Sequence, residues 1–252
     1  MVTTLGLPNG FEDGRAAAVS ADGSVIVGGA YKTSNHADHA VRWVAETPAA
    51  ISEGEGYAVS ADGQIAVGGY PSMRAFRWES SAWSVLDGAP AFGISADGTV
   101  IVGGGYSYGP FGEAFRWEGD AATDLGLLPG TVASAGYDAS ADGSVIVGSS
   151  WTAYVDDKAF IWTEADGMRD LQDVLVNDYG LDLANWELTE AVAISDDGMT
   201  IVGNGIYTVM PGVSGPGGWV AHIPEPCSVL LIIVGGACCR PWRRRGSTRK
   251  SV

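Results

Sequence analysis

Five times along the chain, a short apolar run is interrupted by a segment such as Ser-Ala-Asp-Gly and then resumes, as in VSADGSVIVG and ASADGSVIVG. The Asp-Gly pairs begin at Asp22, Asp62, Asp97, Asp142 and Asp197, so that successive copies lie 35 to 55 residues apart. An Asp-Gly pair between apolar runs is a strong local signal for a two-residue β-hairpin, because both residues tolerate a positive φ. Each copy is therefore predicted to begin with a strand, a tight turn and a second strand.

Two further strands follow in the first four copies, and one follows in the last. Alternating aromatic stretches (AVRW, AFRW, AFRW and AFIW) end at Trp43, Trp78, Trp117 and Trp162, and a variant, GWVA, surrounds Trp219. Such stretches suit a pleated, half-buried surface and predict a third strand. A weaker fourth strand follows, as at residues 81–88 and 122–126. Four antiparallel strands in about 40 residues are typical of one blade of a β-propeller.

The sequence therefore predicts an all-β fold, a β-propeller of about five four-stranded blades. The strand after each turn, such as residues 24–28, is apolar on both faces, as expected for a blade packed between two others. Residues 2–6, VTTLG, repeat the fourth-strand pattern, while the last copy stops at its third strand. We expect the N-terminal strand to complete the last blade, because ring closure removes exposed sheet edges. Only residues 168–184 have a helix-like spacing.

Composition agrees with one folded domain over residues 1–223, followed by a tail over residues 224–252. The chain has 252 residues and is 46% hydrophobic, enough for a full-sized core. All 30 acidic residues lie at or before Glu225, whereas six of the 14 basic residues follow it. So acidic a body disfavours binding to phosphate backbones, and no nucleic-acid partner is expected.

The tail has three parts in a fixed order. Pro224, Glu225 and Pro226 come first, an apolar stretch covers residues 227–239, and a basic cluster contains Arg240, Arg243, Arg244 and Arg245. As a helix, the apolar stretch would span about 20 Å, less than a hydrocarbon core of about 30 Å. We therefore expect transient membrane insertion of the tail, with the arginines on the cytoplasmic side.

This tail closely resembles the PEP-CTERM sorting signal of Gram-negative bacteria. The resemblance implies a processing partner of the exosortase type, passage through the inner membrane, and a final location at the cell surface or outside the cell. The first ten residues, MVTTLGLPNG, have neither a basic segment nor an apolar core, so no secretory signal peptide is expected in this sequence.

The body resembles the HAF family of extracellular repeats. That family is marked by His-Ala-Phe before Trp, which this chain carries in altered form at His39-Ala40-Val41-Arg42-Trp43 and, without the histidine, at Ala75-Phe76, Ala114-Phe115 and Ala159-Phe160. The resemblance implies an extracellular repeat architecture and brings no established reaction with it.

Binding residues are sought in what the copies do not share, because a residue present in every copy is explained by the fold. The loops between second and third strands differ in length and content, and in an up-and-down blade they emerge on the face opposite the Asp-Gly turns. Variable loops on a rigid scaffold commonly carry binding sites. Tyr108, Phe111 and Tyr154 are unshared aromatic residues in these loops, suited to stacking on a sugar or a protein partner.

Neither a metal site nor a cofactor is expected. The two histidines His36 and His39, with Asp38 beside them, superficially suggest a metal site, but there is no candidate for the third ligand. The three cysteines, Cys227, Cys238 and Cys239, all belong to the tail. No nucleophile elbow, phosphate-binding loop or zinc-protease helix is present, so no catalytic residue is proposed.

We therefore expect an exported, non-enzymatic repeat protein of the cell surface or extracellular matrix that binds a polysaccharide or an envelope protein through its loop face. Two alternatives stay open. One is a propeller glycosidase or lyase acting on extracellular polysaccharide, with carboxylates lining a central funnel, because a fold does not decide function. The other is a purely structural matrix protein without a saturable ligand.

Overall fold

The computed structural model describes residues 2–70, 74–86, 89–105, 112–152 and 157–223, which contain nineteen strands and one helix. The strands form five antiparallel sheets, here called blades 1 to 5 in chain order. Blade 1 contains β1 (Asp13–Val19), β2 (Val25–Lys32), β3 (Ala37–Val44) and β4 (Thr47–Glu53). Blade 2 contains β5 (Glu55–Val59), β6 (Ile65–Gly69), β7 (Ala75–Glu79) and β8 (Ala82–Leu86).

The remaining blades follow the same order. Blade 3 contains β9 (Ala91–Ile94), β10 (Val100–Gly103), β11 (Ala114–Glu118) and β12 (Ala121–Gly126). Blade 4 contains β13 (Ala133–Ala139), β14 (Val145–Trp151), β15 (Asp157–Thr163) and β16 (Gly167–Asp170). Blade 5 contains only β17 (Trp186–Ile194), β18 (Thr200–Met210) and β19 (Val213–His222).

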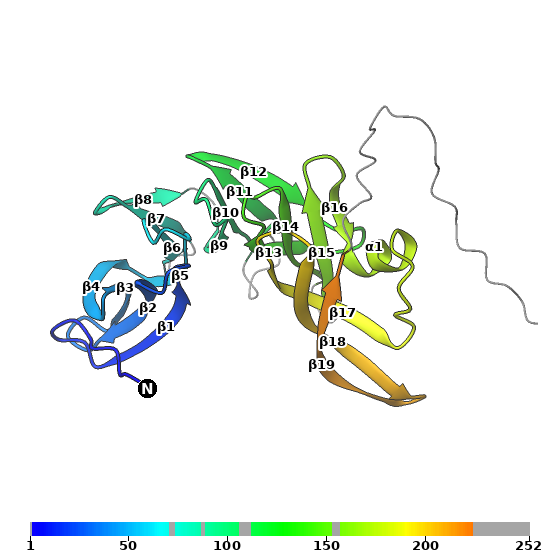
Figure 1. The fold of residues 1–252 in the computed structure, drawn as a ribbon, viewed down its shortest axis with the longest axis horizontal. Coiled ribbons are helices and arrows are strands. Elements are labelled where there is room, and N and C mark those ends of the chain that lie inside the picture. The colour runs from blue at the N-terminus through cyan, green and yellow to red at the C-terminus, as the bar shows by residue number, and fades with distance from the viewer. Residues whose placement is uncertain (1, 71–73, 87–88, 106–111, 153–156, 224–252) are drawn as a thin grey trace, which may run out of the picture.

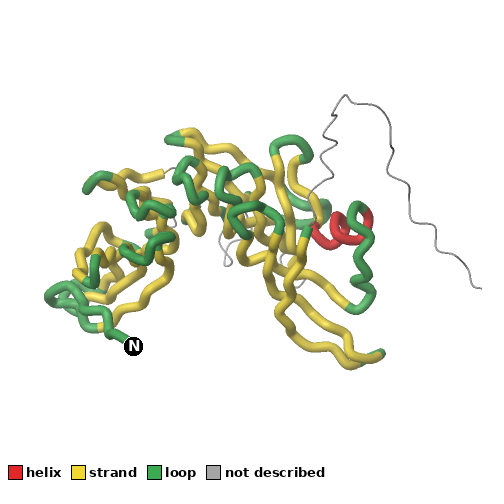
Figure 2. Tube along the Cα trace, in the orientation of Figure 1, coloured by secondary structure: helices red, strands yellow, loops and turns green. Residues whose placement is uncertain are grey.

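The five blades follow one another along an arc (Figure 1). The first strand of each blade contacts the first strand of the next, and in blades 1 to 3 the fourth strands lie on the outer rim of the arc. Figure 2 shows that most of the described chain consists of strands joined by loops and turns, and that helix occurs in one place only. The predicted all-β propeller architecture is confirmed.

The second strands of blades 2, 3 and 4 are buried on both faces because each lies between two neighbouring blades. In β6, Ile65 and Val67 pack against blade 3, whereas Ala66 packs against blade 1. Successive side chains of a strand point to opposite faces, so an uninterrupted apolar run supplies both contacts. The apolar phrase that follows each turn is thus the contact that joins one blade to the next.

The glycine that ends this phrase has a steric cause. The pairing of β5 with β6 shifts between Gly56 and Ala58, so β5 bulges opposite Gly68. A Cβ atom on Gly68 would lie 1.9 Å from the Glu55 carbonyl oxygen and 2.7 Å from the Phe76 ring. Glycine is required here by the close approach of another backbone, and its φ is not in the left-handed region.

The repeated Arg and Trp of the third strands join neighbouring blades. The Arg42 guanidinium lies 4.8 Å from the ring centroid of Trp78 in the next blade, and Arg116 lies 5.8 Å from that of Trp162. These are cation–π distances. The variant stretch around Trp219 forms the third strand of blade 5 as expected, but Trp219 does not occupy the position of these tryptophans. Trp219 pairs with Gly203, the place that the phenylalanine holds in other blades, and its indole covers that glycine.

The expected closure by the N-terminal strand is wrong. In the part of the chain that the structure describes, blade 5 has three strands, and Figure 1 shows it well apart from blade 1. Leu5 and Leu7 instead pack on blade 1 itself, against Val41 and Trp43, and the Trp43 indole N–H donates to the Gly6 carbonyl at 2.6 Å. This local contact buries Trp43 within its own blade, so the segment does not have to reach across the ring to cover an apolar face.

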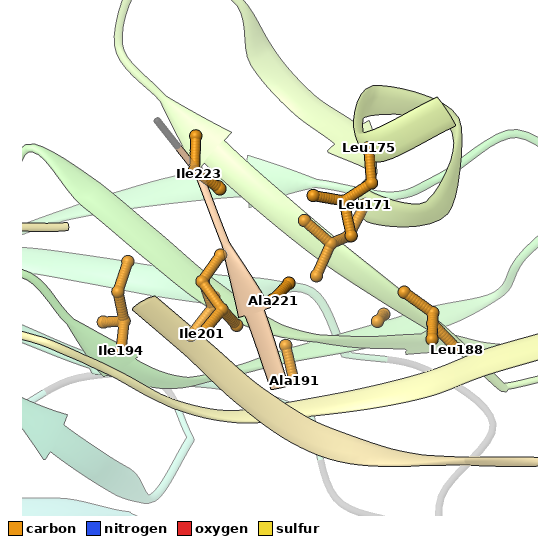
Figure 3. Packing of buried hydrophobic residues seen from close by; sticks show 10 residues of the cluster. Leu171, Leu175, Leu188, Ala191, Ile194, Ile201, Ala221 and Ile223 are labelled. Atoms are coloured by element: carbon orange, nitrogen blue, oxygen red, sulfur yellow. The ribbon is translucent and has the colours of Figure 1, made fainter. Parts of the chain in front are cut away.

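The insertion before blade 5 contains the helix α1 (Leu171–Asn177), shorter than the helix-like pattern suggests. Asp170 caps its N-terminus by accepting the backbone N–H of Gln172 at 3.0 Å. Leu171 and Leu175 pack with Leu188, Ile201 and other residues between blades 4 and 5 (Figure 3). Within the described ranges, no helix has the length and apolar character needed to cross a membrane.

Candidate functional site

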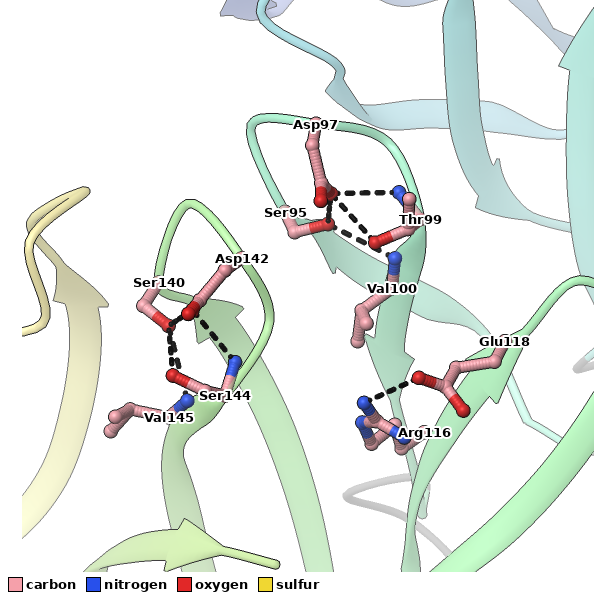
Figure 4. A network of polar contacts seen from close by, with 10 residues as sticks. All are labelled: Ser95, Asp97, Thr99, Val100, Arg116, Glu118, Ser140, Asp142, Ser144 and Val145. Carbon is pink, nitrogen blue, oxygen red and sulfur yellow. Dashed lines mark hydrogen bonds and ion pairs between the residues drawn. The ribbon is translucent and has the colours of Figure 1, made fainter.

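The five turn aspartates have one structural role, as expected. In blade 4, an Asp142 carboxylate oxygen accepts from the Ser140 hydroxyl at 2.8 Å and from the Ser144 N–H at 3.0 Å, while the Ser140 oxygen accepts from the Val145 N–H (Figure 4). The other four turns repeat this network. These carboxylates are consumed by their own turns.

The turn is longer than the expected two-residue hairpin. The Ser140 N–H donates to the Val145 carbonyl, so four residues lie between the closing pair. The Val145 N–H donates to the Ser140 hydroxyl, which supplies the second hydrogen bond of the closing pair and stabilises the longer loop. Donated N–H and O–H bonds also stabilise the charged form of the aspartate, and the pKa of Asp142 falls to about 2, chiefly because of the Ser144 N–H.

The three aromatic residues nominated for binding, Tyr108, Phe111 and Tyr154, lie outside the described residues. The same holds for the sorting-signal residues Pro224, Glu225, Pro226, Arg240, Arg243, Arg244 and Arg245. Both assignments stay predictions.

The histidines of blade 1 are occupied with local contacts. The Tyr31 hydroxyl lies 3.0 Å from His36 Nδ1, and Asn35 Nδ2 lies 3.2 Å from His39 Nε2. The ring of His39 also packs edge-on against Phe11 at 5.3 Å. In the part of the chain that the structure describes, no three His, Cys, Asp or Glu side chains are grouped so that they could hold a metal ion.

A groove of about 390 Å³ lies between the outer hairpins of blades 2 and 3. We call it the blade 2–3 groove; it is lined by Arg77, Glu79, Ala82, Trp83, Ser84, Gly119 and Asp120. Blade 2 contributes the β7–β8 hairpin and blade 3 contributes the turn between β11 and β12. Third strands run back toward the Asp-Gly turns, so this groove lies at the end opposite the loop face.

The ion pair in this groove is part of the repeat. Arg77 Nη2 lies 2.8 Å from Glu79 Oε2, and the corresponding pair in blade 3, Arg116 and Glu118, has a distance of 2.7 Å. Figure 4 shows the blade 3 pair. The arginine is mostly buried and Glu79 is half exposed. The pair orients Glu79 as a hydrogen-bond acceptor at the groove wall.

Trp83 is what distinguishes this groove from its repeats. Trp83 is 54% exposed, whereas every other described tryptophan is buried or partly buried. Its ring centroid lies 6.0 Å from that of Tyr70, edge to face, so the indole is held from one side. An exposed indole beside Glu79, Ser84 and Asp120 offers an apolar surface and several hydroxyl partners.

Sequence reasoning placed Trp83 in a fourth strand but did not select it. The available signal was its uniqueness, since the fourth strands TPAAISE, AATDLG and GMRD contain no aromatic residue. Trp83 lies in a strand, whereas binding residues were expected in the loops.

A second, apolar groove of about 470 Å³ runs along β19. It is lined by Leu175, Leu181, Leu183, Trp186, Leu188 and residues 218–222. In the described residues β19 has no fourth strand beside it, and Pro216 fits such an edge position because proline cannot donate to a ladder.

The first strands carry aromatic residues in blades 2, 3 and 4. The ring centroids of Tyr57 and Phe92 are 5.7 Å apart, and those of Phe92 and Tyr137 are 5.9 Å apart. Burial raises the pKa of Tyr137. An ion pair joins Arg15 of β1 to Glu55 of β5. These contacts tie neighbouring blades together.

These features define a β-propeller with a groove on its rim, and known structures agree with the fold. The chain is similar to TolB from Acinetobacter baumannii, with 14% identity, a TM-score of 0.51, and coverage of 77% of this chain and 50% of that one. It is also similar to the β-propeller domain of the Trilobed protease from Pyrococcus furiosus, with 13% identity, a TM-score of 0.52, and coverage of 84% and 69%.

This chain therefore spans about half the length of the TolB structure. No family model and no curated protein matches it. At such identities the likeness concerns the fold alone.

Proposed function

We propose that this protein is an exported, non-enzymatic β-propeller of the cell surface or extracellular matrix that binds polysaccharide in the blade 2–3 groove. The observation that carries the proposal is the exposed Trp83 side chain in a groove with Arg77, Glu79, Ser84 and Asp120. The export part rests on the resemblance of residues 224–252 to a sorting signal.

A sugar fits this chemistry because a pyranose ring has an apolar face and a rim of hydroxyl groups. The indole of Trp83 covers the apolar face, and an exposed tryptophan on a rigid strand loses little conformational entropy on binding. The carboxylates of Glu79 and Asp120 accept hydroxyl hydrogen bonds, and Ser84 both donates and accepts. The groove is open at the rim, as a polymer chain requires.

A glycan array probed with the full chain tests the proposal. Trp83→Ala should reduce binding to the best-bound glycan about 5- to 150-fold, because stacking on one aromatic ring contributes about 1–3 kcal/mol. Val85→Ala is the matched control, since Val85 is exposed on the same strand and does not line the groove. Equal binding by both variants and the parent would refute the groove assignment.

Two other outcomes concern the alternatives. Cleavage of an arrayed glycan that depends on Glu79 or Asp120 would favour a glycosidase or lyase. Absence of saturable binding to any glycan would favour a purely structural matrix protein.

A further inference from the structure

The contact between neighbouring blades is repeated four times within the chain. One side of this contact is formed by the third residue of the apolar phrase in each of blades 1 to 4. All four residues are 0% exposed: Val27, Val67, Val102 and Val147. On the other side lies the last residue of the next blade's first strand. Three of these four residues, Ile94, Ala139 and Ile194, are at most 8% exposed.

Blades 1 and 5 each carry one uncovered half of this contact. Val202 of blade 5 holds the position of Val27 in the strand pairing, and it is 40% exposed. Val19 of blade 1 holds the position of Ile194, and it is 58% exposed. We call Thr200, Val202 and Val220 the blade 5 face, and Val19, Gly23 and Ile26 the blade 1 face.

The turns show the same complementarity. The Ala21 N–H donates to the Ala61 carbonyl of the next blade at 3.0 Å, and the series ends where the Ala141 N–H donates to the Asp196 carbonyl. The described residues supply no backbone acceptor for the Asp196 N–H and no backbone donor for the Ala21 carbonyl. One end of the arc therefore presents a donor and the other presents the matching acceptor.

The turn glycines give an independent indication. A Cβ on Gly63 would meet the Val25 side chain of the preceding blade at 2.5 Å, and Gly98, Gly143 and Gly198 are packed in the same manner. A Cβ on Gly23 would meet nothing within 4 Å. The space next to Gly23 is therefore open. In the other blades this space is filled by the first residue of the preceding blade's apolar phrase, such as Val25, and Thr200 holds that position in blade 5.

The N-terminal segment extends the blade 1 face. Residues 3–8, TTLGLP, resemble residues 123–129, TDLGLLP, in which β12 ends as the fourth strand of blade 3. Leu125 packs toward blade 4, and Leu5 packs in the same manner toward blade 1. The segment thus lies where the fourth strand of a preceding blade would lie, and among the described residues no fourth strand lies beside β19.

We propose that a second copy of this chain docks head to tail, with the blade 5 face of one copy against the blade 1 face and N-terminal segment of the next. The occupant is another copy because both halves of one interface, which is already formed four times inside the chain, are present on the same molecule. The two faces lie apart at opposite ends of the arc (Figure 1), so they are free to meet in different copies. Such a contact is heterologous and builds a ring or a filament.

Sedimentation velocity of the full chain tests the proposal, in a mild nonionic detergent that shields residues 227–239. We expect species larger than the 26.0 kDa chain that increase with concentration. Val202→Asp and Val19→Asp, on opposite faces, should each raise the dissociation constant at least tenfold. Val209→Asp is the matched control, because Val209 is 63% exposed but lies at the β18–β19 hairpin outside both faces. Circular dichroism checks that each variant folds.

Disulfide formation distinguishes contact between copies from closure within one chain. In a background with Cys227, Cys238 and Cys239 changed to serine, Val19→Cys and Val202→Cys variants are mixed and oxidised. Val27 and Val59, the counterparts of this pair, pack in one cluster. A linked dimer that forms only in the mixture supports the proposal.

Three results would overturn it. The first concerns a double variant that carries both Val19→Cys and Val202→Cys in one chain. If it forms a compact, internally linked monomer while the mixture of single variants forms no dimer, the arc closes on itself. The second is a monomer at all concentrations without any cross-link. The third is assembly that the two face variants leave unchanged, which means that other surfaces hold the copies together.

Discussion

Gly148 offers the sharpest test of the blade geometry. It lies in β14 opposite the bulge of β13, where the pairing shifts between Gly136 and Asp138. A Cβ atom at this position would lie 2.0 Å from the Ala135 carbonyl oxygen and 2.8 Å from the Phe160 ring. Because the first neighbour is backbone, it cannot move without opening the bulge.

Gly148→Ala should therefore destabilise the fold by about 3 kcal/mol, near the upper end of the usual 1–3 kcal/mol for overpacking. For a chain of this length, about 2–4 °C of melting temperature corresponds to 1 kcal/mol, so the melting temperature should fall by about 6–12 °C. Differential scanning calorimetry measures this directly.

Gly215→Ala is the matched control. Gly215 also lies in a strand, and a Cβ there would meet nothing within 4 Å. Alanine in a strand is favoured over glycine by about 0.5–1 kcal/mol, so this variant should melt at or slightly above the parent temperature. If Gly148→Ala melts within about 2 °C of the parent, the steric account of the repeat glycine is wrong.

Three further predictions concern charge and the N-terminal segment. The lowered pKa of Asp142 means that its stabilising effect is complete above its unfolded pKa near 4 and is lost as the pH falls toward 2, so Asp142→Asn should flatten the acid loss of melting temperature. Burial raises the pKa of Asp138, which accepts the Ile194 N–H at 2.9 Å, so its charge becomes unfavourable as the pH rises above about 4. The melting temperature of Asp138→Asn relative to the parent should therefore increase between pH 4 and 7, and a decrease would contradict this. Leu7→Ala should lower the urea unfolding free energy by about 2 kcal/mol, because it removes part of the half-buried cover of Trp43; an unchanged urea midpoint would mean that the segment does not hold blade 1.

The candidate site was harder to predict than the blades. Trp83 stands in a segment that sequence reasoning correctly placed in a fourth strand, but nothing local says that its indole is exposed next to a turn of another blade. Trp83 and Asp120 are far apart in the sequence, and they line one groove only because blade 2 packs on blade 3. Loop residues such as Tyr108 were selected because loops commonly carry binding sites, and that prediction is untested.

The amino-acid sequence by itself determined the blade and its contact with the next blade. The spacing of apolar residues sets two-sided burial, the Ser and Asp side chains close each turn through bonds within six residues, and each such phrase acts on its immediate neighbours only. Only the tertiary structure decided what happens at the two ends of the series. Leu5, Gly6 and Leu7 have the pattern of a closing strand, yet they cover Trp43 of the adjacent blade, because a contact with residues close along the chain costs less loop entropy than one across the whole arc.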